Sequence, residues 1–145
     1  MAFPFFHGLL DVTFRFFEEN YGREGLRRYL RWLAENYYAE LIDAARRDGL
    51  DALEKYWRDV ADDEMAAEAQ AHMDVERDGE RLFIEVKRCP AFVWMEENGR
   101  QACECYCEQC AVMNAAIADA AGIEFELRGG QGQCVQVFRA GGDGR

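Results

Sequence analysis

Apolar residues recur every three or four positions through the first half of the chain, which is the spacing of an amphipathic helix. The pattern predicts helices over residues 9–21, 24–47, 50–60 and 62–71, with Asn20-Tyr21-Gly22 and Asp48-Gly49 as stops. The apolar positions of the longest of them are Leu26, Tyr29, Leu30, Leu33, Tyr37, Leu41 and Ala44. The N-terminal half is therefore expected to be helical.

From His72 onward the apolar positions change to a period of two. Residues 73–77 and 81–88 alternate across Asp78-Gly79, and residues 123–128 and 134–139 alternate across a glycine-rich turn, so each pair predicts a hairpin. Between them we expect a short helix or turn over 91–98 and a helix over 100–121 that Gly122 stops.

These elements predict an α+β fold. The helical N-terminal half packs on a small, mainly antiparallel four-stranded sheet, and a cysteine-bearing helix lies between the two hairpins. We expect a single domain over residues 1–139 and a flexible tail over residues 140–145, which offer nothing to pack.

Charge and hydropathy exclude several classes of partner. Lys and Arg total 17 against 28 Asp and Glu, and the net charge of −11 repels phosphate backbones and anionic membrane surfaces. No apolar run approaches the roughly 20 residues that a membrane span needs, and the N-terminus has no secretory cleavage signal. We therefore expect a cytoplasmic protein that binds neither nucleic acid nor membrane.

The cysteines are the most informative residues for chemistry. The six are Cys89, Cys103, Cys105, Cys107, Cys110 and Cys134, four of them within eight residues. In a helix with about 100° per residue, Cys103, Cys107 and Cys110 fall within an arc of about 60°, while Cys105 points away. Cys89 ends one predicted strand and Cys134 begins another. If those strands are antiparallel neighbours, both residues can converge with Cys107 and Cys110.

Clustered thiols in a reducing compartment indicate metal, redox or nucleophile chemistry before they indicate disulfides. Four thiolates suit zinc or an iron–sulfur cluster, because soft sulfur ligands match these metals. The expected metal ligands are Cys89, Cys103, Cys107, Cys110 and Cys134. Two other interpretations stay open: a nucleophilic thiolate near a helix N-terminus, and cysteines that are merely small buried hydrophobes. His72 either joins the site or is a structural histidine.

Residues 83–138 resemble the L-2-amino-thiazoline-4-carboxylic acid hydrolase-like family. The shared features are a strand running into Cys89-Pro90, a helical Cys107-x-x-Cys110, and Gly132-x-Cys134-x-x-x-Phe138. The resemblance implies an enzyme that hydrolyses a carbon–nitrogen or carbon–sulfur bond of a small molecule, with Cys107, Cys110 and Cys134 as catalytic residues. That family, and similarly organomercurial lyases, commonly reads Cys-x-x-Asp where this chain has Cys110, and a thiol there favours a soft metal.

The last of these motifs is also similar to ligand-sensing domains of the vinyl-reductase type, which hold zinc through cysteines near their C-terminus. This similarity implies a binding module with a structural metal, in which aromatic helices enclose a small ligand. A redox or iron–sulfur protein without hydrolytic activity is a third interpretation. One route to hydrolysis is a three-thiolate zinc whose open fourth position activates water, and the candidate bases are Glu104, Glu108 and Glu126.

Overall fold

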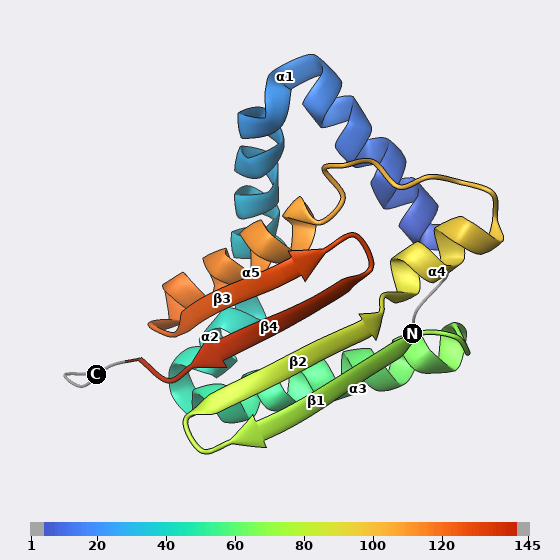
Figure 1. Cartoon of the computed structure of the whole chain (residues 1–145). Helices are drawn as coiled ribbons and strands as arrows, with labels where there is room; N and C mark the ends of the chain where they lie inside the picture. Colours follow the sequence, from blue (N-terminus) through green and yellow to red (C-terminus); the bar gives the residue numbers. More distant parts are fainter. Residues whose placement is uncertain (1–4, 142–145) are drawn as a thin grey trace.

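The computed structural model describes residues 5–141 and has the predicted α+β fold (Figure 1). The elements are α1 (Phe5–Tyr37), α2 (Ala39–Asp48), α3 (Leu50–Ala67), β1 (His72–Asp78), β2 (Arg81–Arg88), α4 (Pro90–Glu97), α5 (Glu108–Ala121), β3 (Glu124–Gly130) and β4 (Gln133–Arg139). Helices α2, α3 and α5 lie along one face of the sheet, and α1 packs on α5.

The two predicted hairpins form one antiparallel sheet. Its strand order is β1-β2-β4-β3, so the hairpins join through their second strands. In the β2–β4 pair, Val86 lies opposite Cys134 and Leu82 lies opposite Phe138. The condition for bringing Cys89 and Cys134 together is therefore met: these strands are antiparallel neighbours, and the end of β2 lies beside the start of β4.

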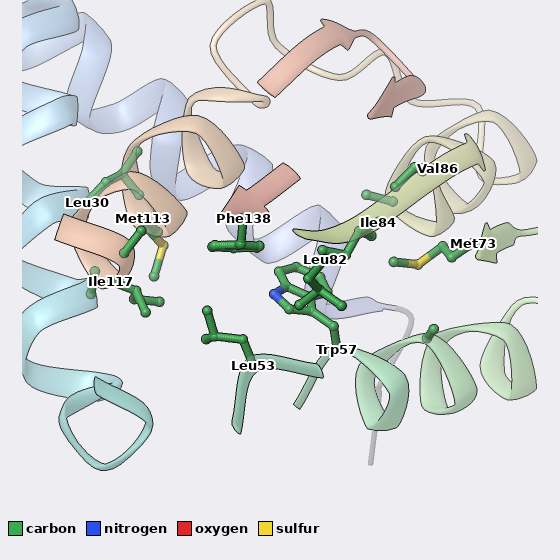
Figure 2. Packing of buried hydrophobic residues seen from close by; sticks show 14 of the residues in the cluster. Leu30, Leu53, Trp57, Met73, Leu82, Ile84, Val86, Met113, Ile117 and Phe138 are labelled. Atoms are coloured by element: carbon green, nitrogen blue, oxygen red, sulfur yellow. The ribbon is translucent and has the colours of Figure 1, made fainter. Parts of the chain in front are cut away.

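The core lies between the sheet and the helices. Alternation along β1 and β2 points Met73, Ile84 and Val86 toward the helices, while Glu85 and Lys87 point to solvent. The side chains that pack together here include Leu30, Leu53, Trp57, Met73, Leu82, Ile84, Val86, Met113, Ile117 and Phe138 (Figure 2). Burial of a side chain of this size contributes about 1.5–3 kcal/mol, so this layer holds the sheet against the helices.

The predicted helix boundaries are partly wrong in the N-terminal half. The helix expected over 24–47 is interrupted at Tyr38, whose ring packs edge-on against Tyr56 of α3 with centroids 6.0 Å apart. Residues 62–67 continue α3 and do not form a helix of their own. Gly22 kinks α1 with φ 73° and ψ 173°, a conformation that glycine alone adopts readily, but the helix resumes directly after it.

The predicted helix over 100–121 begins only at Glu108. The preceding backbone is bonded to side chains of α1: the Asp11 carboxylate accepts the Cys103 N–H at 2.7 Å, and the Arg15 guanidinium donates to the Gln101 carbonyl at 2.5 Å. These bonds satisfy polar groups that a helix would otherwise pair. The inference that Cys103 shares a helical face with Cys107 is therefore wrong.

The description of the chain's end stops at residue 141. The predicted flexible tail lies outside the described residues from 142 onward, while Ala140 donates its N–H to the Glu80 carbonyl at 2.9 Å. Within residues 5–141, no helix has both the length and the apolar character to cross a membrane.

Candidate functional site

Four of the predicted ligands come from three separate parts of the chain. Cys89 lies between β2 and α4, Cys107 immediately precedes α5, Cys110 lies in the first turn of α5, and Cys134 lies on β4. The Cys89 N–H donates to the Gly132 carbonyl at 3.0 Å, which ties the end of β2 to the turn before β4. The sheet pairing thus carries Cys89 and Cys134 to the same end of the sheet, next to the start of α5.

Burial and neighbouring cysteines raise the pKa of three of these thiols, those of Cys89, Cys110 and Cys134. Burial raises the pKa of Cys110, and the neighbouring Cys89, Cys134 and Cys107 raise it further. Burial likewise raises the pKa of Cys89 to about 11, with contributions from Cys107 and Cys134, and the pKa of Cys134 is raised by burial and by Cys107. Every pair among the four is therefore within electrostatic range, and the group resists acquiring several negative charges without a compensating cation.

N–H groups point at these sulfur atoms. The Gln131 backbone N–H donates to Cys107 Sγ at 3.3 Å, and Gln136 Nε2 donates to Cys134 Sγ at 3.7 Å. Hydrogen bonding from Gln136 also lowers the pKa of Cys110, against the larger effect of burial. Donors of this kind favour the charged thiolate over the neutral thiol.

Gln136 and Asn114 are site residues that the sequence analysis missed. Both are buried, with 2% and 7% of their surface exposed, and Asn114 Nδ2 donates to Gln136 Oε1 at 2.6 Å. With its oxygen occupied by Asn114, the Gln136 amide presents its nitrogen to the thiols. The signal was in the sequence: Gln136 is a polar residue two positions from both Cys134 and Phe138 on an alternating strand, and Asn114 is one helical turn after Cys110.

The four thiols lie at the same end of the sheet, but their sulfur atoms are not as close together as the ligands of one metal ion. Over residues 5–141, no group of three or more His, Cys, Asp or Glu side chains is arranged closely enough to hold a metal ion. All six cysteines are free thiols. The chemistry of the donor set nevertheless fits a soft metal, because it combines four sulfur atoms with N–H groups that donate to two of them.

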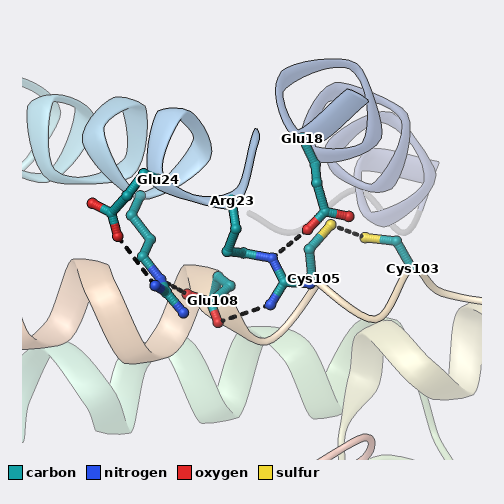
Figure 3. Close-up of polar contacts among 7 residues, drawn as sticks. Glu18, Arg23, Glu24, Cys103, Cys105 and Glu108 are labelled. Carbon is teal, nitrogen blue, oxygen red and sulfur yellow. Dashed lines mark hydrogen bonds and ion pairs between the residues drawn. The ribbon is translucent and has the colours of Figure 1, made fainter. Parts of the chain in front are cut away.

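Cys103 and Cys105 form a separate pair. Their sulfur atoms are 2.6 Å apart and face each other beneath α1, beside Glu18 and Arg23 (Figure 3). Burial, followed by Cys105 and Asp11, raises the pKa of Cys103. Cys103, which the sequence grouped with the metal ligands, thus has Cys105 as its sulfur neighbour, and Cys105 does not simply point away as the helical geometry suggested.

The glutamates considered as catalytic bases lie in surface or ion-pair positions. Glu108 accepts from Arg27 Nε at 2.7 Å, which fixes the start of α5 to α1 (Figure 3). Glu126 accepts from Arg128 at 2.7 Å, and Arg128 is the first of the groups that lower its pKa. Glu104 is exposed in the turn between the paired cysteines. Two of these three carboxylates, those of Glu108 and Glu126, are thus each paired with an arginine.

His72 lies at the start of β1, on the exposed side of the sheet. Its Nε2 is 3.2 Å from the Asp74 carboxylate, which is half-buried on the same strand. Strand β2 separates β1 from β4, so the backbone that carries His72 is not adjacent to the backbone that carries Cys134.

A cleft of about 770 Å³ opens beside Cys89. Its wall includes Lys87, Arg88 and Arg100, together with the Gln131-Gly132 turn that contacts Cys107. A second, aromatic groove of about 490 Å³ lies at the kink of α1, lined by Phe17, Tyr21, Gly25, Arg28, Tyr29 and Trp32. The first of these clefts places cationic side chains next to one of the four thiols.

Fold and site together define an α+β protein with a thiol-rich centre at the junction of sheet and helix. Comparison with models of known protein families and with curated proteins gave no match for this chain.

Proposed function

We propose that the protein binds a soft metal, zinc or an iron–sulfur cluster, through Cys89, Cys107, Cys110 and Cys134. The observation that carries the proposal is the convergence of three distant chain segments: β2 pairs with β4 beside Cys134, the Cys89 N–H bonds to Gly132, and the adjoining Gln131 N–H bonds to Cys107 Sγ. Thiolate sulfur is the ligand that such metals select. A cytoplasmic location suits the proposal, because thiols remain reduced there.

To hold an ion, the four side chains would have to move closer together. Cys89 and Cys107 lie just before helices, so turning their side chains leaves the backbone pairing of α4 and α5 intact. The Gln131 N–H and the Gln136 amide already face the sulfur atoms that would become thiolates. A bound cation would neutralise the charge that the four thiols otherwise resist.

Hydrolysis is the enzymatic form of this proposal, and it requires one thiol to leave the ligand set. Four thiolates complete a tetrahedral zinc site, whereas catalytic zinc keeps an open position. Cys89 is the thiol on the wall of the cleft that also carries Arg88 and Arg100. These cations would pair with the carboxylate of a small substrate such as L-2-amino-thiazoline-4-carboxylate.

Metal binding is tested on reduced, chelator-treated full-length protein handled without oxygen. We expect one zinc per chain in a competition titration, and loss of tight binding in Cys107→Ser and Cys134→Ser but not in the matched Cys105→Ser variant. Iron and sulfide reconstitution followed by visible absorption distinguishes the cluster from zinc. Protein that binds neither, or that binds equally well without Cys107, would sink the proposal.

Hydrolytic activity is tested on the metal-loaded protein with L-2-amino-thiazoline-4-carboxylate, following ring opening by the appearance of a thiol. We expect Arg88→Ala to raise KM more than it lowers kcat, because the arginine binds the carboxylate and not the reacting bond. If the fully metal-loaded protein does not turn over this substrate, the proposed hydrolase activity is refuted, whereas the proposed metal site is not.

The aromatic groove on α1 favours a second candidate, a small-ligand sensor with a structural metal. Phe17 stacks on Tyr29 with centroids 4.2 Å apart, and Trp32 lines the same groove while 58% exposed. An apolar or aromatic ligand with an anionic group would match these rings and Arg28. Trp32 fluorescence, compared with a Trp32→Phe variant, should respond to such a ligand at micromolar concentrations, and an unchanged spectrum across an anionic aromatic panel would remove this candidate.

A further inference from the structure

We propose that Cys103 and Cys105 are a redox-active dithiol that closes to an intramolecular disulfide, distinct from the four-thiol site. Their sulfur atoms lie 2.6 Å apart, well inside the distance at which two non-bonded sulfur atoms touch. The proposal does not rest on metal binding, because neither residue is needed for the four-thiol site.

The local backbone explains why these two thiols meet. Tyr106 donates its N–H to the Cys103 carbonyl at 3.1 Å, and Glu108 donates to the Cys105 carbonyl at 3.0 Å, so two consecutive turns run from Cys103 into α5. A β-turn folds the chain back over four residues, and in the first of these turns the side chains on either side of Glu104 come together. The Cys103 N–H bond to Asp11 then holds this turn against α1.

The surroundings favour an uncharged product. Cys103 is 6% exposed and Cys105 is 0% exposed, with the Glu18–Arg23 ion pair beside them (Figure 3). A buried thiolate is costly, whereas a disulfide carries no charge and needs no hydrogen-bond donor.

Access for the reaction comes through local opening. Residues 98–107 contain neither helix nor strand, and side-chain bonds from Asp11 and Arg15 hold the segment to α1. Segments without helix or strand open more readily than packed helices and strands, and opening this one takes Cys103 and Cys105 out of the core. When open, either cysteine is solvated and can ionise as an ordinary thiol.

The oxidant is a low-molecular-weight disulfide of the glutathione class. One cysteine thiolate attacks a sulfur atom of the oxidant, forms a mixed disulfide and releases one glutathione thiolate, which takes up a proton. The second cysteine attacks the protein sulfur of that mixed disulfide and releases the second glutathione thiol. The two cysteines lose two protons and two electrons, and the oxidant gains both. In the cytoplasm such a bond would be transient and would report the oxidation of the thiol pool.

The test equilibrates the full chain, both native and during refolding, in reduced and oxidised glutathione mixtures. Samples are quenched with acid, alkylated in denaturant and cleaved with a glutamate-specific protease, which cuts after Glu104 between the two cysteines. We expect fragments joined by a Cys103–Cys105 disulfide, lighter than the dithiol by two hydrogen atoms, with Cys107 and Cys110 alkylated. The result should be the same with and without zinc.

Matched single variants separate the proposal from general oxidation. Cys103→Ser and Cys105→Ser each retain one thiol of the pair and should stop at a glutathione adduct, because no second thiol resolves it. Cys110→Ser should still form the disulfide. Two outcomes after refolding in fully oxidised glutathione would overturn the proposal: Cys103 and Cys105 each found alkylated, or a disulfide between Cys107 and Cys110 instead. Neither outcome bears on whether Cys107 and Cys134 are needed for zinc.

Discussion

The buried Asn114–Gln136 pair offers the sharpest test of how the thiol site is built. Gln136→Leu removes the amide that donates to Cys134, and it leaves Asn114 Nδ2 without its 2.6 Å acceptor. A buried polar group without a partner costs about 1–3 kcal/mol. We therefore expect the metal-free variant to lose about that much free energy of unfolding.

The double variant Asn114→Leu/Gln136→Leu separates packing from thiol support. Because both partners become apolar, no orphaned amide remains, and the metal-free protein should recover most of its stability. The thiolates would still lack the Gln136 donor. Loss of an outer hydrogen bond typically lowers metal affinity about 10–100-fold, which is about 1.4–2.7 kcal/mol.

Two measurements are needed on each variant: urea unfolding of the chelated protein, and competition titration with zinc. With Asn114→Leu added, the wild type, the two single variants and the double variant form a double-mutant cycle, in which the coupling between residues 114 and 136 should appear in the free energy of unfolding. If the stable double variant binds zinc as tightly as the wild-type chain, the amide pair serves only the core and does not support the thiolates.

Three further predictions concern the frame around the site. Asp11→Asn should lower the free energy of unfolding by about 1.5–3 kcal/mol at neutral pH, because it removes hydrogen bonds to a charged group. Burial disfavours the charged form of Asp11, but Arg15 and the Cys103 N–H hold its pKa below 3.8. This stabilisation is full above that value and is lost as pH falls through the lower folded pKa, so urea midpoints of wild type and variant should converge in acid. Phe138→Ala should cost about 3–5 kcal/mol by leaving a cavity, because Phe138 is fully buried and its ring centroid lies 4.9 Å from that of Phe125. Gly22→Ala should cost about 1–3 kcal/mol through its backbone alone, because nothing lies within 4 Å of an added Cβ.

Each of these has an outcome that contradicts it. A difference between wild type and Asp11→Asn that persists unchanged far below pH 3.8 would mean that the carboxylate charge is not the source of its stabilisation. A Phe138→Ala variant within error of wild type in thermal unfolding would mean that the sheet and α5 can close over the space. An unaffected Gly22→Ala would mean that α1 can straighten at the kink at no cost.

The sheet and the convergence of distant cysteines could be predicted because both follow from local rules. Period-two alternation around Asp78-Gly79 identifies a hairpin wherever it occurs, and antiparallel pairing then places the end of β2 beside the start of β4. No knowledge of the helices was needed. Cys89 and Cys134 could therefore be assigned to one end of the sheet from the sequence.

The start of α5 could not be predicted, because tertiary contacts determine it. Residues 100–107 contain no proline and could continue a helix, but Asp11 and Arg15 bind their backbone from a distance of more than eighty positions in the chain. Helical spacing cannot register a partner so remote. The role of Gln136 and Asn114 could not be predicted for a related reason. A polar residue on an apolar face can be assigned to a site only once its hydrogen-bond partner is known.

The position at which α5 begins also explains why one cysteine-rich stretch contains two kinds of thiol site. A helix from Arg100 would place Cys103 with Cys107 and Cys110 and leave Cys105 alone. With Asp11 holding the Cys103 N–H, the chain instead forms turns that pair Cys103 with Cys105, and the helix starts one residue after Cys107. Cys107 is then free to meet the turn at Gln131, which donates its N–H to that sulfur. A single buried carboxylate on α1 thus separates the dithiol from the proposed metal ligands, and Asp11→Asn should disturb the Cys103–Cys105 pairing more than it disturbs zinc binding.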